Sequence, residues 1–159
     1  MPEDRIEKQV VLKAPLARVW RAISDSQQFG AWFRIDFEGE FREGAQVRGR
    51  ITFPVSRGSD PAPEYQHLTA DFFIERIRAP HYLSYRWHPY AIDPTVDYSH
   101  EPMTLVEFQL TEVPEGTQLT ITESGFERLP AGRKPEAFRM NEGGWTAQLE
   151  NVEQYVARR

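Results

Sequence analysis

The sequence predicts an α+β fold in which a curved antiparallel sheet of six to seven strands is covered by one long C-terminal helix. Residues 35–123 contain successive segments of alternating apolar and polar residues joined by short turns, a pattern typical of antiparallel strands. Residues 133–159 carry apolar residues at helical spacing. One face of such a sheet must be buried, and this helix has the longest apolar stripe, so we expect the two to pack together.

The C-terminal helix is predicted from five apolar residues at steps of seven, four, three and four, which lie on one stripe: Phe138, Trp145, Leu149, Val152 and Val156. Pro135 suits the first helical turn, where its missing N–H would have no partner. A helix of about 24 residues rises roughly 36 Å, enough to cross a small domain. Gly143 and Gly144 interrupt the run at about 1 kcal/mol each relative to alanine, so we expect a bend or a close backbone approach there.

The N-terminal part predicts a strand followed by two short helices. Residues 5–13 alternate as a half-buried strand, which Ala14-Pro15 ends. A helix of about ten residues follows, with one apolar face formed by Leu16, Val19, Trp20 and Ile23. Asp25 and Ser26 can cap a second helical turn, which Gly30 weakens and which carries Phe29, Trp32 and Phe33.

The middle of the chain predicts the remaining strands, at residues 35–41, 47–53, 65–77, 83–87, 104–113 and 119–123. Glu43-Gly44 supplies a tight turn, and Phe72-Phe73 blurs the alternation enough to predict a bulge. Residues 54–63 contain three prolines and two serines and predict a loop. Residues 89–102 fit no period, and long irregular stretches of this kind are usually functional or mobile.

The composition excludes several classes of protein. The 159 residues are the size of one domain, 1–159, and no apolar run approaches the ~18 residues that a membrane span needs. The first four residues do not begin a secretory signal. There are no cysteines, which removes disulfides and thiolate metal sites and fits a reducing, cytoplasmic location. With a net charge of −5 and no basic stripe, we expect neither nucleic acid nor a membrane as partner, while the oligomeric state stays open.

Four local patterns follow one another along the chain: Ala14-Pro15 with Val19-Trp20, Leu83 to Trp87 after Ala79-Pro80, Gly116 to Phe126, and Gly143-Gly144-Trp145 leading to Leu149. Together they resemble the family of heat-shock protein 90 ATPase activator homologues in the START/SRPBCC superfamily. The resemblance implies the helix-grip (START/Bet v 1-like) fold, in which a curved sheet wraps a C-terminal helix and leaves a cavity between them.

The resemblance also implies a small-molecule binding protein more often than an enzyme, with an apolar ligand and a role related to stress or to cochaperones. Two alternatives remain open. One is an enzyme of the cyclase or hydrolase type that uses Glu123, because polyketide cyclases belong to the superfamily. The other is a protein–protein interaction module that acts on a chaperone, although we expect no room in this chain for the additional N-terminal domain of the namesake cochaperones. The family supplies no shared catalytic set, and we expect no cofactor.

The aromatic candidates for ligand binding stand at inward-facing strand positions, on the two short helices or on the long helix: Trp20, Trp32, Phe37, Tyr85, Trp87, Phe108, Phe138 and Trp145. They either fill an ordinary core or line a cavity. Ligand pockets are largely apolar with a few placed polar groups, and the excess of large flat side chains favours a cavity.

Glu123 and Asn141 are the polar candidates. Glu123 shares the parity of Leu119 and Ile121, so we expect its carboxylate to face the cavity and the final helix, near Asn141 or Trp145, unless the strand has ended and it reaches solvent. Facing the cavity, it would anchor a ligand or act as a general acid or base. Asn141 either hydrogen-bonds in the pocket or caps the expected bend.

The irregular stretch gathers residues of the types that bind metals or transfer protons: His88, Asp93, Asp97, His100 and Glu101. Their spacing matches no recognised site, so we predict no metal. A mobile flap beside the mouth of the cavity is the better interpretation. His67 and His81 fall near strand ends and receive no role.

Overall fold

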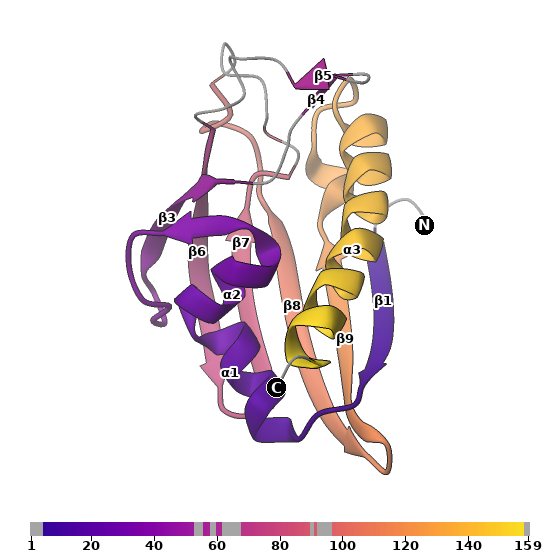
Figure 1. Ribbon diagram of the computed structural model, residues 1–159. Helices are drawn as coiled ribbons and strands as arrows, with labels where there is room; N and C mark the ends of the chain where they lie inside the picture. The colour runs from indigo at the N-terminus through magenta and orange to yellow at the C-terminus, as the bar shows by residue number, and fades with distance from the viewer. Residues whose placement is uncertain are drawn as a thin grey trace.

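The computed structural model describes residues 5–52, 56–57, 60–61, 68–89, 91 and 97–157. Within these residues a seven-stranded antiparallel sheet has the order β1-β9-β8-β7-β6-β3-β2. Figure 1 shows the helices α1, α2 and α3 on the same side of this sheet, α1 and α2 over one half and α3 over the other. The predicted α+β architecture, with two short helices after the first strand and a long helix at the end, is confirmed.

The strands of the sheet are β1 (Arg5–Leu12), β2 (Ile35–Phe37), β3 (Gln46–Ile51), β6 (Thr69–Arg78), β7 (Tyr82–Trp87), β8 (Thr104–Val113) and β9 (Gly116–Ser124). The strand predicted at 35–41 is shorter than expected, because pairing with β3 ends at Phe37, although Phe41 still packs into the core. The loop predicted at 54–63 contains a two-stranded ladder of β4 (Ser56–Arg57) and β5 (Asp60–Pro61), and its other residues lie outside the described part.

The bulge predicted at Phe72-Phe73 lies elsewhere in β6. Both residues keep regular pairing with β3, opposite Val47 and Gln46. The register shift falls against β7, between Ile74 and Arg76. The bulge prediction was therefore wrong in position, because Phe72 and Phe73 do alternate, with Phe72 fully buried and Phe73 half-buried.

The two short helices, α1 (Leu16–Ser24) and α2 (Ser26–Phe33), meet at a single capping residue. Asp25 ends α1 and begins α2, and its carboxylate accepts a hydrogen bond from the Gln27 backbone N–H at 2.9 Å. The cap predicted from sequence is therefore present, and it fixes the angle at which α2 delivers its aromatic residues to the core.

The long helix α3 (Lys134–Ala157) is continuous over 24 residues and follows a short 3-10 turn, η2 (Phe126–Arg128). Trp145, Val152 and Val156 of the predicted stripe are buried, and Phe138 and Leu149 pack against the core while partly exposed. The close backbone approach expected at Gly143-Gly144 is absent, since a Cβ at either glycine would meet no atom within 4 Å.

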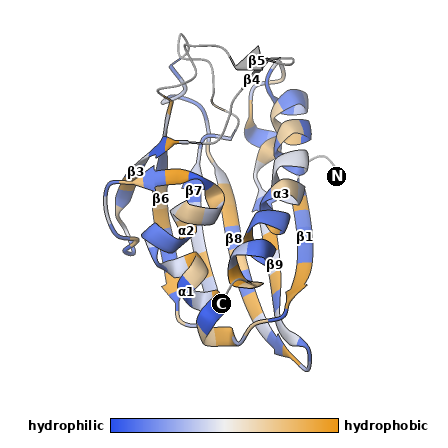
Figure 2. Cartoon of the chain, in the orientation of Figure 1, coloured by the Kyte–Doolittle hydropathy of each residue, from blue (hydrophilic) through white to orange (hydrophobic). Residues whose placement is uncertain are grey.

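The core between the sheet and the helices is dominated by aromatic rings. Phe29 lies at its centre, with six rings around it at centroid distances of 4.7–5.9 Å: Trp32, Phe33, Phe37, Phe41, Phe72 and Phe108. Tyr85 stacks on Phe72 with ring centroids 4.0 Å apart, and its buried hydroxyl has no hydrogen-bond partner among the described residues. Figure 2 shows hydrophobic and hydrophilic residues alternating along the strands, as a sheet with one buried face requires.

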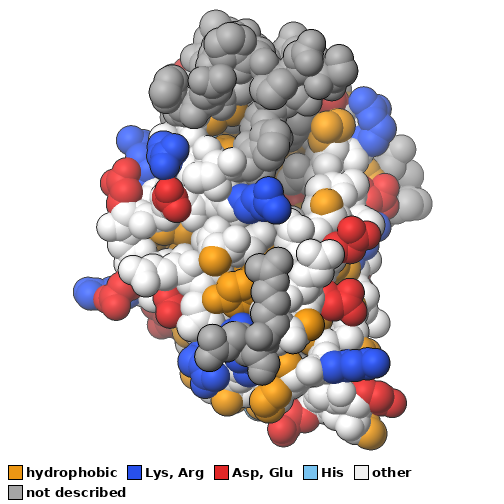
Figure 3. All heavy atoms as spheres, in the orientation of Figure 1, with side chains coloured by type: hydrophobic (Ala, Val, Ile, Leu, Met, Phe, Trp, Pro, Cys, Tyr) orange, Lys and Arg blue, Asp and Glu red, His pale blue; other side chains and the backbone are white. Residues whose placement is uncertain are grey.

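The surface carries charges of both signs. On the face drawn in Figure 3, acidic and basic side chains are interspersed over the helices and the sheet edge. Among the described residues, no helix is long and apolar enough to cross a membrane.

The substitution Gly143→Ala is expected to raise the free energy of unfolding by about 0.5–1 kcal/mol, because the glycine is in open space inside a helix. The matched substitution Gly30→Ala in α2 is expected to lower it, because a Cβ there would lie 2.2 Å from the Ile35 carbonyl oxygen. Urea unfolding followed by circular dichroism measures both. Destabilisation by Gly143→Ala would contradict the open space around this glycine.

Candidate ligand-binding site

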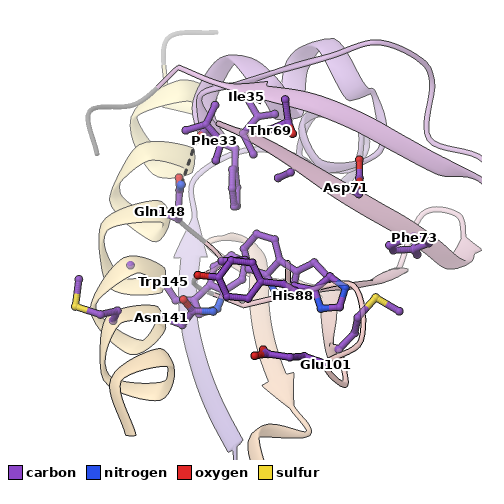
Figure 4. Close-up of a pocket in the computed structure, with 18 of the residues that line it drawn as sticks. Phe33, Ile35, Thr69, Asp71, Phe73, His88, Glu101, Asn141, Trp145 and Gln148 are labelled. Carbon is purple, nitrogen blue, oxygen red and sulfur yellow. Dashed lines mark hydrogen bonds between the residues drawn. The ribbon is translucent and has the colours of Figure 1, made fainter. Parts of the chain in front are cut away.

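A cavity of about 870 Å³ lies between the sheet and α3 (Figure 4). Its lining is mostly apolar and includes Phe33, Ile35, Ile51, Trp87, Met103 and Trp145. A smaller set of polar side chains shares the surface, among them Thr69, Asp71, His88, Glu101, Asn141 and Gln148. The volume falls in the range of about 300–1,000 Å³ found for small-molecule pockets.

The walls come mainly from α3, from β6 and from lining residues between His88 and Met103, and α2, β2, β3 and β7 add the rest. Figure 4 shows Gln148, Trp145 and Asn141 projecting from α3 along one side, and Asp71 and Phe73 of β6 on the opposite side. Phe33 and Ile35, at the junction of α2 and β2, close one end. The Gln148 side chain donates to the Phe33 carbonyl oxygen at 3.2 Å and so joins α3 to the end of α2.

A buried carboxylate, that of Glu123, lies next to this cavity and is hydrogen-bonded to part of its lining. Glu123 of β9 is fully inaccessible to solvent, and its two oxygens accept hydrogen bonds from four side chains. The donors are Trp87 Nε1 at 2.8 Å, Thr104 Oγ1 at 2.5 Å, Asn141 Nδ2 at 2.9 Å and Trp145 Nε1 at 2.8 Å. One side chain therefore connects β7, β8 and β9 with the long helix.

The sheet register brings these donors together. Trp87 pairs with Thr104 across β7 and β8, while Glu123 pairs with Val106 two residues further along β8, so all face the same side. Asn141 and Trp145 are four residues apart on α3 and share one helical face. The expected position of Glu123 near Asn141 and Trp145 is confirmed, and the alternative that it reaches solvent is wrong.

The environment of Glu123 acts on its pKa in two directions. Burial raises the pKa above the ordinary value of 4.5, and the hydrogen bonds from Thr104, Trp145, Trp87 and Asn141 lower it, with burial the largest effect. The indole and amide N–H groups can only donate, whereas the Thr104 hydroxyl can also accept. Of the four partners of a protonated Glu123, the two indoles therefore cannot accept a hydrogen bond from it, whereas the Thr104 hydroxyl and, with the amide rotated, the Asn141 oxygen can.

Of the ten predicted ligand-binding residues, the structure places three in the cavity wall: Trp87, Asn141 and Trp145. Glu123 does not line the cavity with them, because these three side chains lie between its carboxylate and the open space. It holds three lining side chains in place through these hydrogen bonds. The ligand-binding role of the whole set stays a prediction.

The other six predicted residues belong to the core rather than to the lining. Trp32 is buried and donates from Nε1 to the Ala22 carbonyl oxygen at 2.8 Å. Phe108 lies fully buried under Trp145, with ring centroids 5.9 Å apart. The remaining members are a buried Tyr85 and the partly buried Trp20, Phe37 and Phe138.

Several lining residues are missing from the sequence prediction, and some of them carry a usable signal. Asn141, Gly144, Trp145, Gln148 and Asn151 recur at helical spacing and all line the cavity. This stripe lies beside the apolar stripe of α3 and shares Trp145 with it. The sequence analysis considers Gly144 only as an interruption of the helix. Phe33, Ile51 and Met103 carry no local pattern that separates them from ordinary core residues.

The irregular stretch contributes to the cavity in part. His88, Asp97 and Glu101 line it, His100 is exposed and is not among the lining residues, and Asp93 lies outside the described residues. No group of three histidine or acidic side chains in the described part of the chain is arranged to hold a metal ion.

Arg133, just before α3, holds the segment 97–101 in place. Its Nε donates to Glu101 Oε1 at 2.8 Å, and its Nη2 donates to the Pro89 carbonyl oxygen at 2.9 Å. Its guanidinium group also lies over the Tyr98 ring, 4.7 Å from the centroid. The flap predicted beside the cavity mouth is thus tied to the start of the helix, and its mobility stays a prediction.

The curved sheet and the long C-terminal helix that packs on it form the helix-grip fold. The sequence matches the model of the family described as Activator of Hsp90 ATPase homolog 1-like protein over residues 13–157. The chain therefore belongs to this family, as the four sequence patterns indicated.

Solved structures share the fold at low sequence identity. A protein from Mesorhizobium loti is 21% identical, with a TM-score of 0.71 and 97% of each chain covered. A protein from Arthrobacter aurescens is 16% identical, with a TM-score of 0.74, 99% of this chain covered and 88% of that one. A protein in the dynemicin biosynthetic locus is 21% identical, with a TM-score of 0.69, 97% of this chain covered and 47% of that one. No curated protein matches the sequence.

The substitution Glu123→Gln is expected to lower the free energy of unfolding by about 2–4 kcal/mol, because an amide offers one acceptor oxygen where four donors converge. Chemical denaturation measures the loss. Glu115→Gln, at an exposed turn, is the control with the same change in charge and is expected within about 0.5 kcal/mol of the wild type. Equal effects of the two substitutions would contradict the role given to Glu123.

The raised pKa of Glu123 predicts a specific pH dependence of stability. Since the folded-state pKa exceeds the ordinary 4.5, the contribution is fully present below pH 4.5 and is lost as pH rises through the folded pKa. The free energy of unfolding of the wild type relative to Glu123→Gln should therefore fall as pH rises from about 4.5. A difference that grows with pH would show that the hydrogen bonds outweigh burial.

Proposed function

We propose that the protein binds an apolar small molecule in the cavity between the sheet and α3. The observation that carries this proposal is the cavity of about 870 Å³, walled by Phe33, Trp87 and Trp145 and other apolar side chains. The space is partly open to solvent, and most of the lining surface that it exposes is apolar. A ligand would bury its apolar surface there.

The geometry also supports a site that is formed before the ligand arrives. Trp87 and Trp145 are fixed through their indole N–H groups on Glu123, and Phe33 packs edge-on against both, at 6.1 and 5.8 Å. Side chains that are already ordered lose little conformational entropy on binding. The rings therefore offer a rigid apolar surface at low cost.

The alternative of an enzyme that uses Glu123 has weaker support. A general acid or base must come within hydrogen-bond reach of the reacting group. Glu123 is fully buried, and Trp87, Asn141 and Trp145 separate it from the cavity. A chaperone partner is supported by the description of the family alone, and it remains, with the cytoplasmic location, a prediction.

Two neighbouring glycines in α3 allow a matched test of the cavity. Gly144 lines it and Gly143 does not, and a Cβ at either position meets no atom within 4 Å. Gly144→Leu is expected to fill part of the cavity and to weaken binding of the neutral fluorescent probe Nile red by about tenfold or more, whereas Gly143→Leu should leave binding unchanged. Both substitutions improve helix propensity, so both proteins should fold.

The readouts are the probe's fluorescence on titration and the unfolding temperature with and without the probe. Saturable one-to-one binding that Gly144→Leu alone weakens supports the proposal. Equal affinities of the two variants for the probe would mean that the probe binds outside the cavity. Absence of binding to the wild type would contradict the proposed function. Native mass spectrometry of protein purified from its own cells would then identify a retained ligand.

A further inference from the structure

The hydrogen-bond donors of the cavity lining are largely used within the protein. The indole N–H groups of Trp87 and Trp145 donate to Glu123, and the Asn141 amide nitrogen donates to both oxygens of the same carboxylate. The Gln148 amide nitrogen donates to the Phe33 carbonyl oxygen. An indole has one N–H and no acceptor, so a ligand meets only the apolar faces of these two rings.

The charged side chains among the described lining residues are all acidic, apart from the titratable His88. Three carboxylates line the cavity, those of Asp71, Asp97 and Glu101, and no lysine or arginine is among the described lining residues. Asp71 is paired with Arg48 at 2.9 and 3.1 Å, and Glu101 with Arg133 at 2.8 Å. A carboxylate has more lone pairs than one guanidinium group occupies, so each still accepts. Asp97 accepts a hydrogen bond from the Ser99 backbone N–H at 2.9 Å, which likewise leaves lone pairs for a ligand.

His88 adds a further polar group. Its Nδ1 is buried and has no hydrogen-bond partner among the described residues, and the half-buried ring lines the cavity beside Glu101 (Figure 4). Burial lowers the pKa of His88, against the opposing charges of Glu101, Asp71 and Asp97, so the imidazole is neutral near pH 7. A neutral imidazole has one nitrogen that accepts a hydrogen bond and one N–H that donates, so His88 can accept from an amine without adding a positive charge to the cavity.

We infer that the ligand of this cavity is an apolar molecule that carries an amine, with its N–H groups directed at the carboxylates and the His88 ring, and not a carboxylic acid. The inference rests on the proposed function and adds the chemical class of the ligand. An ammonium group has three donors and no acceptor, so it complements a lining that holds three carboxylates and no basic side chain among the described residues. Arg48 and Arg133 already pair with Asp71 and Glu101, so Asp97 contributes most to the repulsion of an anion.

The test compares three probes with one apolar body and different polar groups: 1-naphthylmethylamine, 1-naphthalenemethanol and 1-naphthoic acid. Calorimetric titration at pH 7 is expected to give the amine a dissociation constant about tenfold lower than that of the alcohol, with the acid binding weakest. Raising the salt concentration from about 20 to about 500 mM should weaken binding of the amine several-fold and leave the affinity for the alcohol unchanged, because salt screens only the charged probe.

Two substitutions locate the effect. Asp97→Asn removes one carboxylate from the lining, and His88→Phe keeps a ring but removes the acceptor. Each substitution is expected to weaken binding of the amine about three- to tenfold and to change the affinity for the alcohol by less than about twofold. Glu115→Gln makes the same change in charge as Asp97→Asn at an exposed turn and should alter neither probe.

The outcomes of these titrations separate this inference from the proposed function. A preference for the amine that Asp97→Asn and His88→Phe reduce supports the inference. Acid or alcohol binding as tight as the amine would overturn it and leave an apolar ligand site. Failure of all three probes to bind, together with failure of Nile red, would overturn both.

Discussion

The structure depends on satisfying one carboxylate that water cannot reach. Burying an ionised carboxylate without partners is among the most costly events in a protein interior. Hydrogen bonds from four donors, on two strands and the long helix, offset part of that cost for Glu123, and burial still raises its pKa. Since hydrogen bonds require donor–acceptor distances near 3 Å, this arrangement sets how closely α3 approaches the sheet and at which residues.

The same hydrogen bonds explain why open space persists beside a tightly packed core. Apolar side chains around a void normally move to fill it, because atoms that face an empty space have no neighbours there to attract them. Trp87 and Trp145 are held at their N–H edges and cannot turn inward. Gly144 contributes no side chain to the wall it forms. The cavity therefore follows from one polar constraint and one missing side chain.

The sequence predicted the elements well because each has its own period. The alternation of Leu119, Ile121 and Glu123 placed the carboxylate correctly, since parity depends only on the strand itself. The alternation did not distinguish Phe108 from Trp87, because both residues face the inner side of the sheet. Phe108 is covered by Phe29, whereas Trp87 lies at the end of β7 beside the cavity. How far along a strand the covering helices extend depends on how they cross the sheet, which periodicity does not encode. The predicted position of the bulge in β6 was wrong for a related reason, because the bulge depends on pairing with β7 and not on the strand's own pattern.

Family membership fixes the fold of this chain but not the chemistry of its cavity, because structures 16–21% identical to it share the architecture with mostly different residues. The ligand class has to be argued from the hydrogen bonds of this chain. Glu123 occupies three N–H groups that would otherwise face, or lie close to, the cavity: two indoles and one amide. Without that carboxylate these three N–H groups would lack their acceptor at the cavity wall. One buried residue thus joins the helix to the sheet and occupies the donors of three lining side chains.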